Sequence, residues 1–202
     1  MPLLNPTATS FLPAISSLST LPDTTVTSTL DLLFEPTSEL HSLALPTIRT
    51  CSFGSYDELI DTLRGQLLTL ASEVQDNSDG KKKLHHVLGS HPRLGAPKAK
   101  KQGEKEEELS EQSRHEQRQL RGGDEKEARR LAELNEEYER TFPGLRYVVF
   151  VNGRGRGVIM EDMERRIRRG DSREEEKEGI QAMCDIAKDR AKKLLKSAEE
   201  AV

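Results

Sequence analysis

The chain has 202 residues, of which 33% are charged and 34% hydrophobic, and its formal net charge at pH 7 is −4. This slightly acidic balance does not favour binding to nucleic acid or to an anionic membrane surface. No apolar run is long enough to span a bilayer, and no basic segment followed by an apolar one marks a signal peptide. We therefore expect one domain with an aliphatic core.

The first part of the chain contains short helical patterns. Residues 1–12 are expected to form a disordered lead-in. A short helix is predicted over residues 29–35, because the proline that follows stops it, and another short turn over residues 40–45. Ser55 and Glu58 have the spacing of a capping box, and leucines follow at helical intervals, so a longer helix is predicted here.

The middle of the chain alternates between helical patterns and polar segments. Residues 81–88 predict a short basic helix that ends at Gly89. Residues 98–108 are dense in charge and are interpreted as a solvated insertion. Helical patterns resume over residues 109–120 and again after Asp124, which is a suitable N-cap.

The C-terminal part contains one β-prone run at residues 147–151. A single run cannot form a sheet, so we expect a short extended segment between helices. A helix that includes Ile159 is expected to end at Gly170, and Asp171 or Ser172 to cap a long final helix. The pattern predicts an all-α bundle of about eight helices over residues 13–198.

His91 lies between the end of a predicted helix and a proline. Proline restricts its own backbone and that of the preceding residue, which suits a histidine whose imidazole must be aimed. Histidine also exchanges protons near neutral pH. The alternative is a loop histidine that only caps the preceding helix.

Ser113, Glu116 and Gln117 have the i, i+3, i+4 spacing of one helix face. A hydroxyl, a carboxylate and an amide on one face can bind a polar heterocycle, and the carboxylate can act together with a histidine. The alternative is a polar helix surface.

Arg190 lies within the apolar stripe of the final helix. A guanidinium in that position is costly unless it meets an anion, and its planar fork suits a carboxylate. We expect Glu116 or a bound substrate to be the only partners near it. The alternative is an arginine that extends to solvent from the edge of the stripe.

The histidines at positions 85, 86, 91 and 115 match no compact zinc pattern, so no metal site is expected. Cys51 and Cys184 are too few and too far apart to indicate a disulfide scaffold, and they fit a reducing compartment. The chain ends in Glu200-Ala201-Val202, which is not a Ser-Lys-Leu peroxisomal signal. We expect a cytoplasmic or peroxisomal protein.

Several segments taken together resemble the 2-oxo-4-hydroxy-4-carboxy-5-ureidoimidazoline (OHCU) decarboxylase family. Leu33-Phe34-Glu35 stands where the family usually has a Phe-Glu pair. The segments that match the family's motifs, in chain order, are His91-Pro92-Arg93-Leu94-Gly95, Ser113-Arg114-His115-Glu116-Gln117, Leu134-Asn135-Glu136-Glu137-Tyr138, 142–149, 159–166 and 186–190.

This resemblance implies an all-α homodimer that acts on a small molecule derived from uric acid without a cofactor. It implies His91, Glu116 and Arg190 as catalytic residues, and it implies a substrate-binding set made of Pro92, Ser113, Gln117, Tyr147 and Val148. The chain departs from the family by an extra residue, Pro143, and by the insertion at residues 98–108. Two alternatives stay open: a non-catalytic helical interaction protein, and a decarboxylase of a related heterocycle.

Overall fold

The computed structural model describes residues 11–72, 78–95 and 125–200, and within these ranges it is helical with no strand. This confirms the predicted all-α fold. The helical segments are η1 (Ile15–Thr20), α1 (Asp23–Leu33), α2 (Ser38–Thr50), α3 (Tyr56–Ala71), α4 (Asp79–Gly89), α6 (Glu125–Thr141), α7 (Arg156–Arg169) and α8 (Ser172–Glu199).

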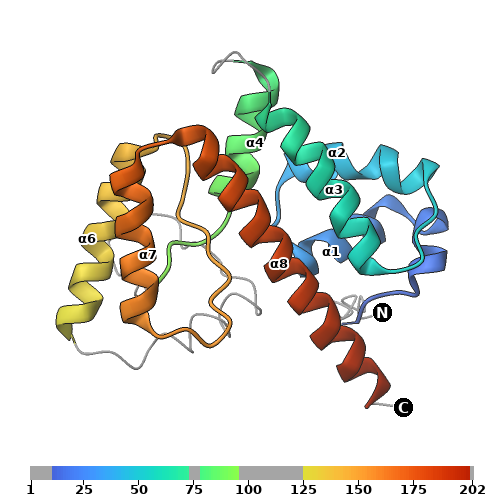
Figure 1. Ribbon diagram of the computed structural model, residues 1–202. Helices are drawn as coiled ribbons and strands as arrows, with labels where there is room; N and C mark the ends of the chain where they lie inside the picture. The colour runs from blue at the N-terminus through green and yellow to red at the C-terminus, as the bar shows by residue number, and fades with distance from the viewer. Residues whose placement is uncertain (1–10, 73–77, 96–124, 201–202) are drawn as a thin grey trace, which may run out of the picture.

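The long helix α8 organises the fold. Figure 1 shows it crossing the molecule, with α1 to α4 on one side and α6 and α7 on the other. It packs against α1, α3 and α4, while α6 packs against α7. Ile180, Met183 and Ala187 are buried along α8, as the predicted stripe requires.

The first helices are longer than their sequence patterns indicate. Helix α1 begins at Asp23 rather than near residue 29, and α2 runs over Ser38–Thr50, so the prediction of a short turn at residues 40–45 was wrong. Pro46 lies inside α2, where it removes a backbone hydrogen bond. Leu40, Ala44 and Ile48 are nevertheless all buried. Packing of this face therefore outweighs the local cost of the proline.

The predicted helix ends are largely confirmed. The Ser55 hydroxyl accepts a hydrogen bond from the Glu58 amide at 3.1 Å. The Glu58 carboxylate accepts from the Gly54 amide at 2.7 Å, one residue before the position that a standard capping box uses. Gly170 ends α7 with a φ of 62°, which favours glycine. The Asp171 carboxylate caps α8 by accepting from two backbone amides at 3.0 Å.

The described chain packs on the core from near its first residues. Leu12 is already buried, and the Tyr56 hydroxyl donates to the Pro13 carbonyl at 2.8 Å, so the chain packs on the core from this point.

Cys51 is exposed and Cys184 is buried, and neither forms a disulfide. Across the described ranges, no helix combines the length and apolar character that a membrane crossing needs.

Candidate active site

His91 lies just beyond the end of α4 and is 6% exposed. Ser90 closes the helix in a helical conformation, and Pro92 follows the histidine directly. The guanidinium of Arg146 donates to the His91 carbonyl at 3.0 Å. The backbone that carries the imidazole is therefore held by a helix end, by a proline and by an arginine from a distant segment.

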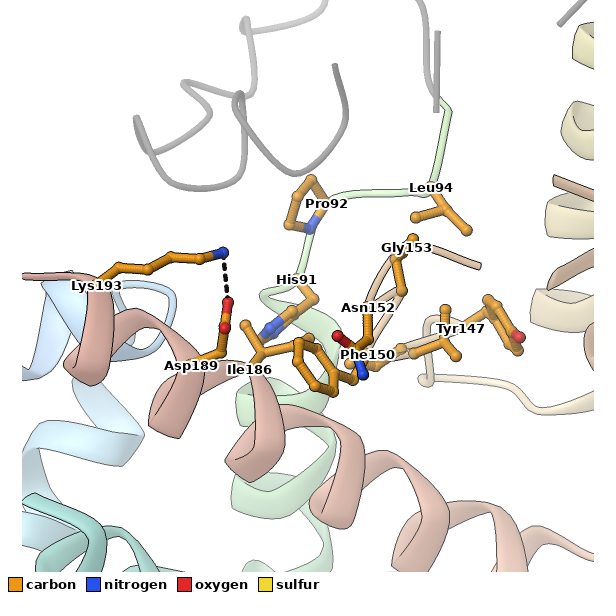
Figure 2. Close-up of a pocket in the computed structure, with 13 residues that line it drawn as sticks. His91, Pro92, Leu94, Tyr147, Phe150, Asn152, Gly153, Ile186, Asp189 and Lys193 are labelled. Carbon is orange, nitrogen blue, oxygen red and sulfur yellow. Dashed lines mark ion pairs between the residues drawn. The ribbon is translucent and has the colours of Figure 1, made fainter. Parts of the chain in front are cut away.

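His91 lines a cavity of about 370 Å³, and three parts of the described chain contribute to its wall. The first is the segment from His91 to Leu94, the second is the segment 147–153, which is neither helix nor strand and ends in a turn, and the third is part of α8. Figure 2 shows these three parts converging around the imidazole. Pro92, Tyr147 and Val148, which the sequence predicts as substrate-binding residues, belong to this lining.

The described wall of the cavity is mainly apolar. Its ionisable groups besides His91 and Tyr147 are Asp189 and Lys193, both on α8. The Asp189 carboxylate and the Lys193 ammonium form an ion pair at 2.6 Å. An apolar cavity with a few convergent polar groups is the usual form of a small-molecule site.

The segment 147–153 is tied to α7 at its start. The Tyr147 hydroxyl donates to Asp162 at 2.7 Å, and the Val148 carbonyl accepts from Arg166 at 3.2 Å. Burial raises the pKa of Tyr147, and the hydrogen bond to Asp162 raises it further. The phenol therefore stays neutral and acts as a hydrogen-bond donor that ties this segment to α7.

Arg190 is buried in the stripe of α8 and is 2% exposed. Its guanidinium donates to Glu35 at 3.0 Å and to the Leu33 carbonyl at 3.4 Å. The expectation that only Glu116 or a substrate could lie near Arg190 was therefore wrong. Glu35 is two residues after the end of α1, and the chain there brings its carboxylate onto Arg190 of α8.

Arg190 is not among the described residues that line the cavity, but it adjoins them on α8. Ile186 and Lys193 line the cavity, and Arg190 is four residues after the first and three before the second, so it is next to both on the helix surface. Ser113, Glu116, Gln117 and the insertion at 98–108 lie outside the described residues, and their roles stay predictions.

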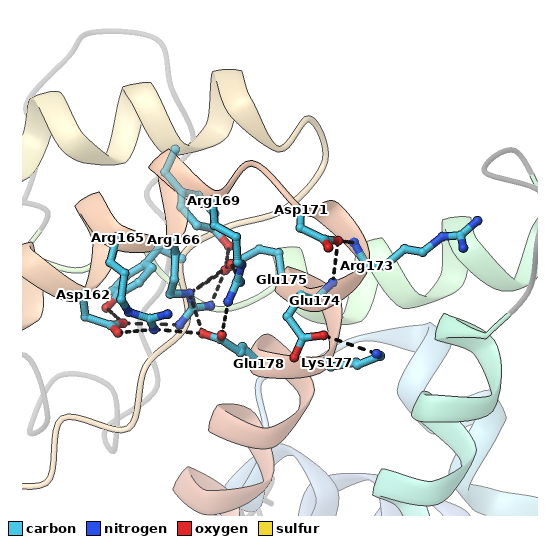
Figure 3. A network of polar contacts seen from close by, with 12 residues as sticks. Asp162, Arg165, Arg166, Arg169, Asp171, Arg173, Glu174, Glu175, Lys177 and Glu178 are labelled. Carbon is cyan, nitrogen blue, oxygen red and sulfur yellow. Dashed lines mark hydrogen bonds and ion pairs between the residues drawn. The ribbon is translucent and has the colours of Figure 1, made fainter.

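A buried network of ion pairs holds the segment 147–153 through Arg166 of α7 (Figure 3). The sequence analysis did not identify this network. Glu175 of α8 accepts from Arg166 Nε at 2.8 Å, from Arg169 at 3.0 Å and from the Tyr138 hydroxyl. Burial disfavours the charged guanidinium, but the hydrogen bonds that it donates to Glu175 outweigh that effect and raise the pKa of Arg166. The network matters for the site because Arg166 also holds the Val148 carbonyl.

The spacing of residues along α7 indicates that Arg166 is buried. Ile159 and Met163 are buried, and Arg166 follows three residues later on the same face. Its guanidinium also lies 4.7 Å from the centre of the Tyr147 ring. An arginine that continues an apolar stripe was noted in α8 at Arg190, and the same criterion identifies Arg166.

A second buried cluster joins α4 to α8. The Lys81 ammonium donates to the Ala71 carbonyl at 2.9 Å and to Glu176, whose other oxygen lies 2.8 Å from His85 Nε2. Burial alone would raise the pKa of Glu176, but hydrogen bonds from His85 and Lys81 outweigh it and lower the pKa. In the part of the chain that the structure describes, no three His, Cys, Asp or Glu side chains gather as a metal site would require.

Comparison with known proteins gives one family. The family model described as OHCU decarboxylase matches residues 19–192, which is most of the chain. No curated protein sequence matches. The matched span contains His91, the segment 147–153 and two of the α8 residues that line the cavity, Ile186 and Asp189. Lys193 follows directly after it.

Proposed function

This chain belongs to the OHCU decarboxylase family, and from that premise we propose that it converts 2-oxo-4-hydroxy-4-carboxy-5-ureidoimidazoline to (S)-allantoin and carbon dioxide. The observation that carries the proposal is His91, a buried histidine on a restrained backbone at the wall of a 370 Å³ cavity. A cavity of that size suits a small heterocycle.

The substrate supplies its own electron sink. The carboxylate and a hydroxyl share one ring carbon, and the neighbouring ring carbon is an imine that bears the ureido group. When the bond to the carboxylate breaks, its electron pair moves into the imine, whose nitrogen takes up a proton. The hydroxyl then loses its proton and becomes a carbonyl, while the neighbouring carbon gains a proton. The sum is one carbon dioxide released and one proton consumed, so we propose that no cofactor takes part.

His91 is proposed as the group that removes the hydroxyl proton and returns a proton to carbon, since an imidazole can do both near neutral pH. Glu116 is proposed to orient the imidazole. Ser113 and Gln117 are proposed to bind the polar edges of the substrate. A wall on one side of the ring directs the proton to one face, which would determine the handedness of the product.

Arg190 is proposed to hold an oxygen of the substrate. Its planar guanidinium suits an oxygen ligand, and bonds to Glu35 and to the Leu33 carbonyl fix its position. Its position on α8, one turn after Ile186 and next to Asp189, puts it beside residues that line the cavity. The network of Arg166 and Glu175 is proposed to support the opposite wall.

The test is direct addition of the purified protein to freshly prepared OHCU, with circular dichroism following the product. The proposal requires a signal of one sign that appears at a rate proportional to protein concentration. If the protein left the spontaneous decay unchanged, the alternative of a non-catalytic interaction protein would stand instead. Prior dialysis against a strong chelator should not change the rate; a loss that zinc restores would contradict the cofactor-free mechanism.

The family resemblance also leads us to propose a homodimer. Light scattering coupled to size-exclusion chromatography measures this directly. A mass near that of one 22.7 kDa chain would refute the dimer without affecting the proposed reaction.

A further inference from the structure

Lys193 is the only lysine or arginine among the described residues that line the cavity. Its side chain is 56% exposed, so the ammonium lies on the open side of the cavity. Figure 2 shows it extending from α8 with its ammonium next to Asp189. The Lys193 ammonium can therefore attract anions to the mouth of the cavity.

The pair between Lys193 and Asp189 leaves the ammonium able to bind a further anion. The two residues are four apart on one helix, at 2.6 Å, and Asp189 is itself 30% exposed. Such exposed pairs within one helix contribute little to stability, so the contact exchanges readily. An ammonium has three N–H donors, and it can keep one on Asp189 while donating the others to a ligand.

We propose that Lys193 binds the carboxylate of the incoming substrate at the cavity mouth, and that Asp189 limits the strength of this contact. The inference rests on the proposed function, in which the substrate is a small carboxylate anion. It assigns substrate recruitment to a residue beyond the part of the chain that the family model matches.

The chemistry of decarboxylation favours a cation that is exposed rather than buried. The carboxylate loses its negative charge as it becomes carbon dioxide, so an ion pair to it is stronger in the ground state than in the transition state. A contact of that kind aids binding but opposes the chemical step. A guanidinium as buried as Arg190 would hold the carboxylate more tightly, because the surrounding dielectric is low. Lys193, exposed and shared with Asp189, attracts the anion without that penalty.

The position also suits release of the product. Carbon dioxide leaves from the carbon that carried the carboxylate, and a carboxylate held at the open side places that bond next to the exit. His91 is 6% exposed and lies deeper, where the hydroxyl on the same carbon would face it. In this orientation, Lys193 and His91 contact different substituents of the same ring carbon, the carboxylate and the hydroxyl.

The experiment is steady-state kinetics on freshly prepared OHCU with Lys193→Met in the full chain. We expect KM to rise by about tenfold, while kcat stays within about twofold of the wild-type value or increases. Lys193→Arg restores the charge and should return KM close to that of the wild type. Lys192→Met is the matched control, because Lys192 is the exposed neighbour on α8 and does not line the cavity. It removes the same charge and should leave KM unchanged.

Salt provides an independent readout. The wild-type KM should rise with ionic strength, and this dependence should be weaker in Lys193→Met, because screening acts on the charge that the variant lacks. An unchanged KM in Lys193→Met, or an equal rise in Lys193→Met and Lys192→Met, would overturn the inference while wild-type turnover still supported the proposed function. Absence of wild-type turnover would instead remove the proposed function itself.

Discussion

The two ends of α8 use charged residues in opposite ways. Near its start, Glu175 bonds to Arg166 of α7 and to Tyr138 of α6, and Glu176 bonds to Lys81 of α4, all of them buried. Near its end, Asp189 bonds to a lysine of its own helix at the rim of the cavity.

The difference lies in what each pair joins. A buried carboxylate that binds groups from several helices fixes those helices relative to one another, and loss of one partner leaves a charge without solvation. An exposed pair within one helix connects no separate parts of the fold, so it contributes little to stability. The first kind of pair serves the fold, and the second is free to serve a ligand. Substitutions at the two ends should therefore separate stability from activity.

The largest effect is expected at the cavity. His91→Ala should lower kcat by about a hundredfold or more, because it removes the proposed proton-transfer group. Its circular dichroism spectrum in the far ultraviolet should stay that of the wild type. His86→Ala is the control, because this histidine is on α4 but its side chain is 70% exposed. Wild-type turnover by His91→Ala would show that the imidazole takes no part in the reaction.

At the start of α8, Glu175→Ala should lower the free energy of unfolding by roughly 3–5 kcal/mol, because it leaves Arg166 buried without its main carboxylate partner. Urea denaturation measures this change. Glu174→Ala removes an adjacent glutamate that is 45% exposed, and it should cost less than about 0.5 kcal/mol. Equal losses in the two variants would mean that the network contributes nothing beyond a surface charge.

Arg190 bonds to the buried carboxylate of Glu35 and is also proposed to bind the substrate, so two variants are needed to separate these roles. Arg190→Met should destabilise the fold by roughly 3 kcal/mol, because Glu35 then keeps a buried charge without this partner. Arg190→Met combined with Glu35→Leu removes both charges and should recover more than half of that loss. Turnover should stay low in both variants. Recovery of turnover together with stability would assign Arg190 a purely structural role.

The smallest effect is expected at Glu176 under acid conditions. Its pKa is lowered in the folded protein, so its ionised form stabilises the fold above the unfolded-state value near 4.5. That stabilisation should disappear as the pH falls below 4.5 toward the folded-state pKa. Glu176→Gln should be less stable than the wild type at neutral pH, and the gap should narrow as the pH falls below that value. A gap that does not change with pH would show that Glu176 titrates normally.

Local patterns predicted much of this molecule. The Ser55 cap, the stop at Gly170 and the cap at Asp171 depend on neighbours within a few residues, and the structure has each of them. Residues 147–151 form neither helix nor strand in the structure, which agrees with the expectation that a single β-prone run cannot form a sheet. Helices α1 and α2 were predicted too short, because Pro46 and the Ser and Thr residues of α1 lower local helix propensity, while burial of one face decides the outcome.

By itself, the sequence determined the helical class, the stripe of α8 and the restrained histidine, because spacing along the chain and the geometry of proline set these properties. Only the tertiary structure decided which charges meet. The Glu35 contact with Arg190 spans 155 residues of chain, and the contact between Lys81 and Glu176 spans 95. No periodicity encodes such pairs, since they form only when packing of the apolar faces brings distant helices together. The same packing places Lys193 beside the cavity that His91 lines.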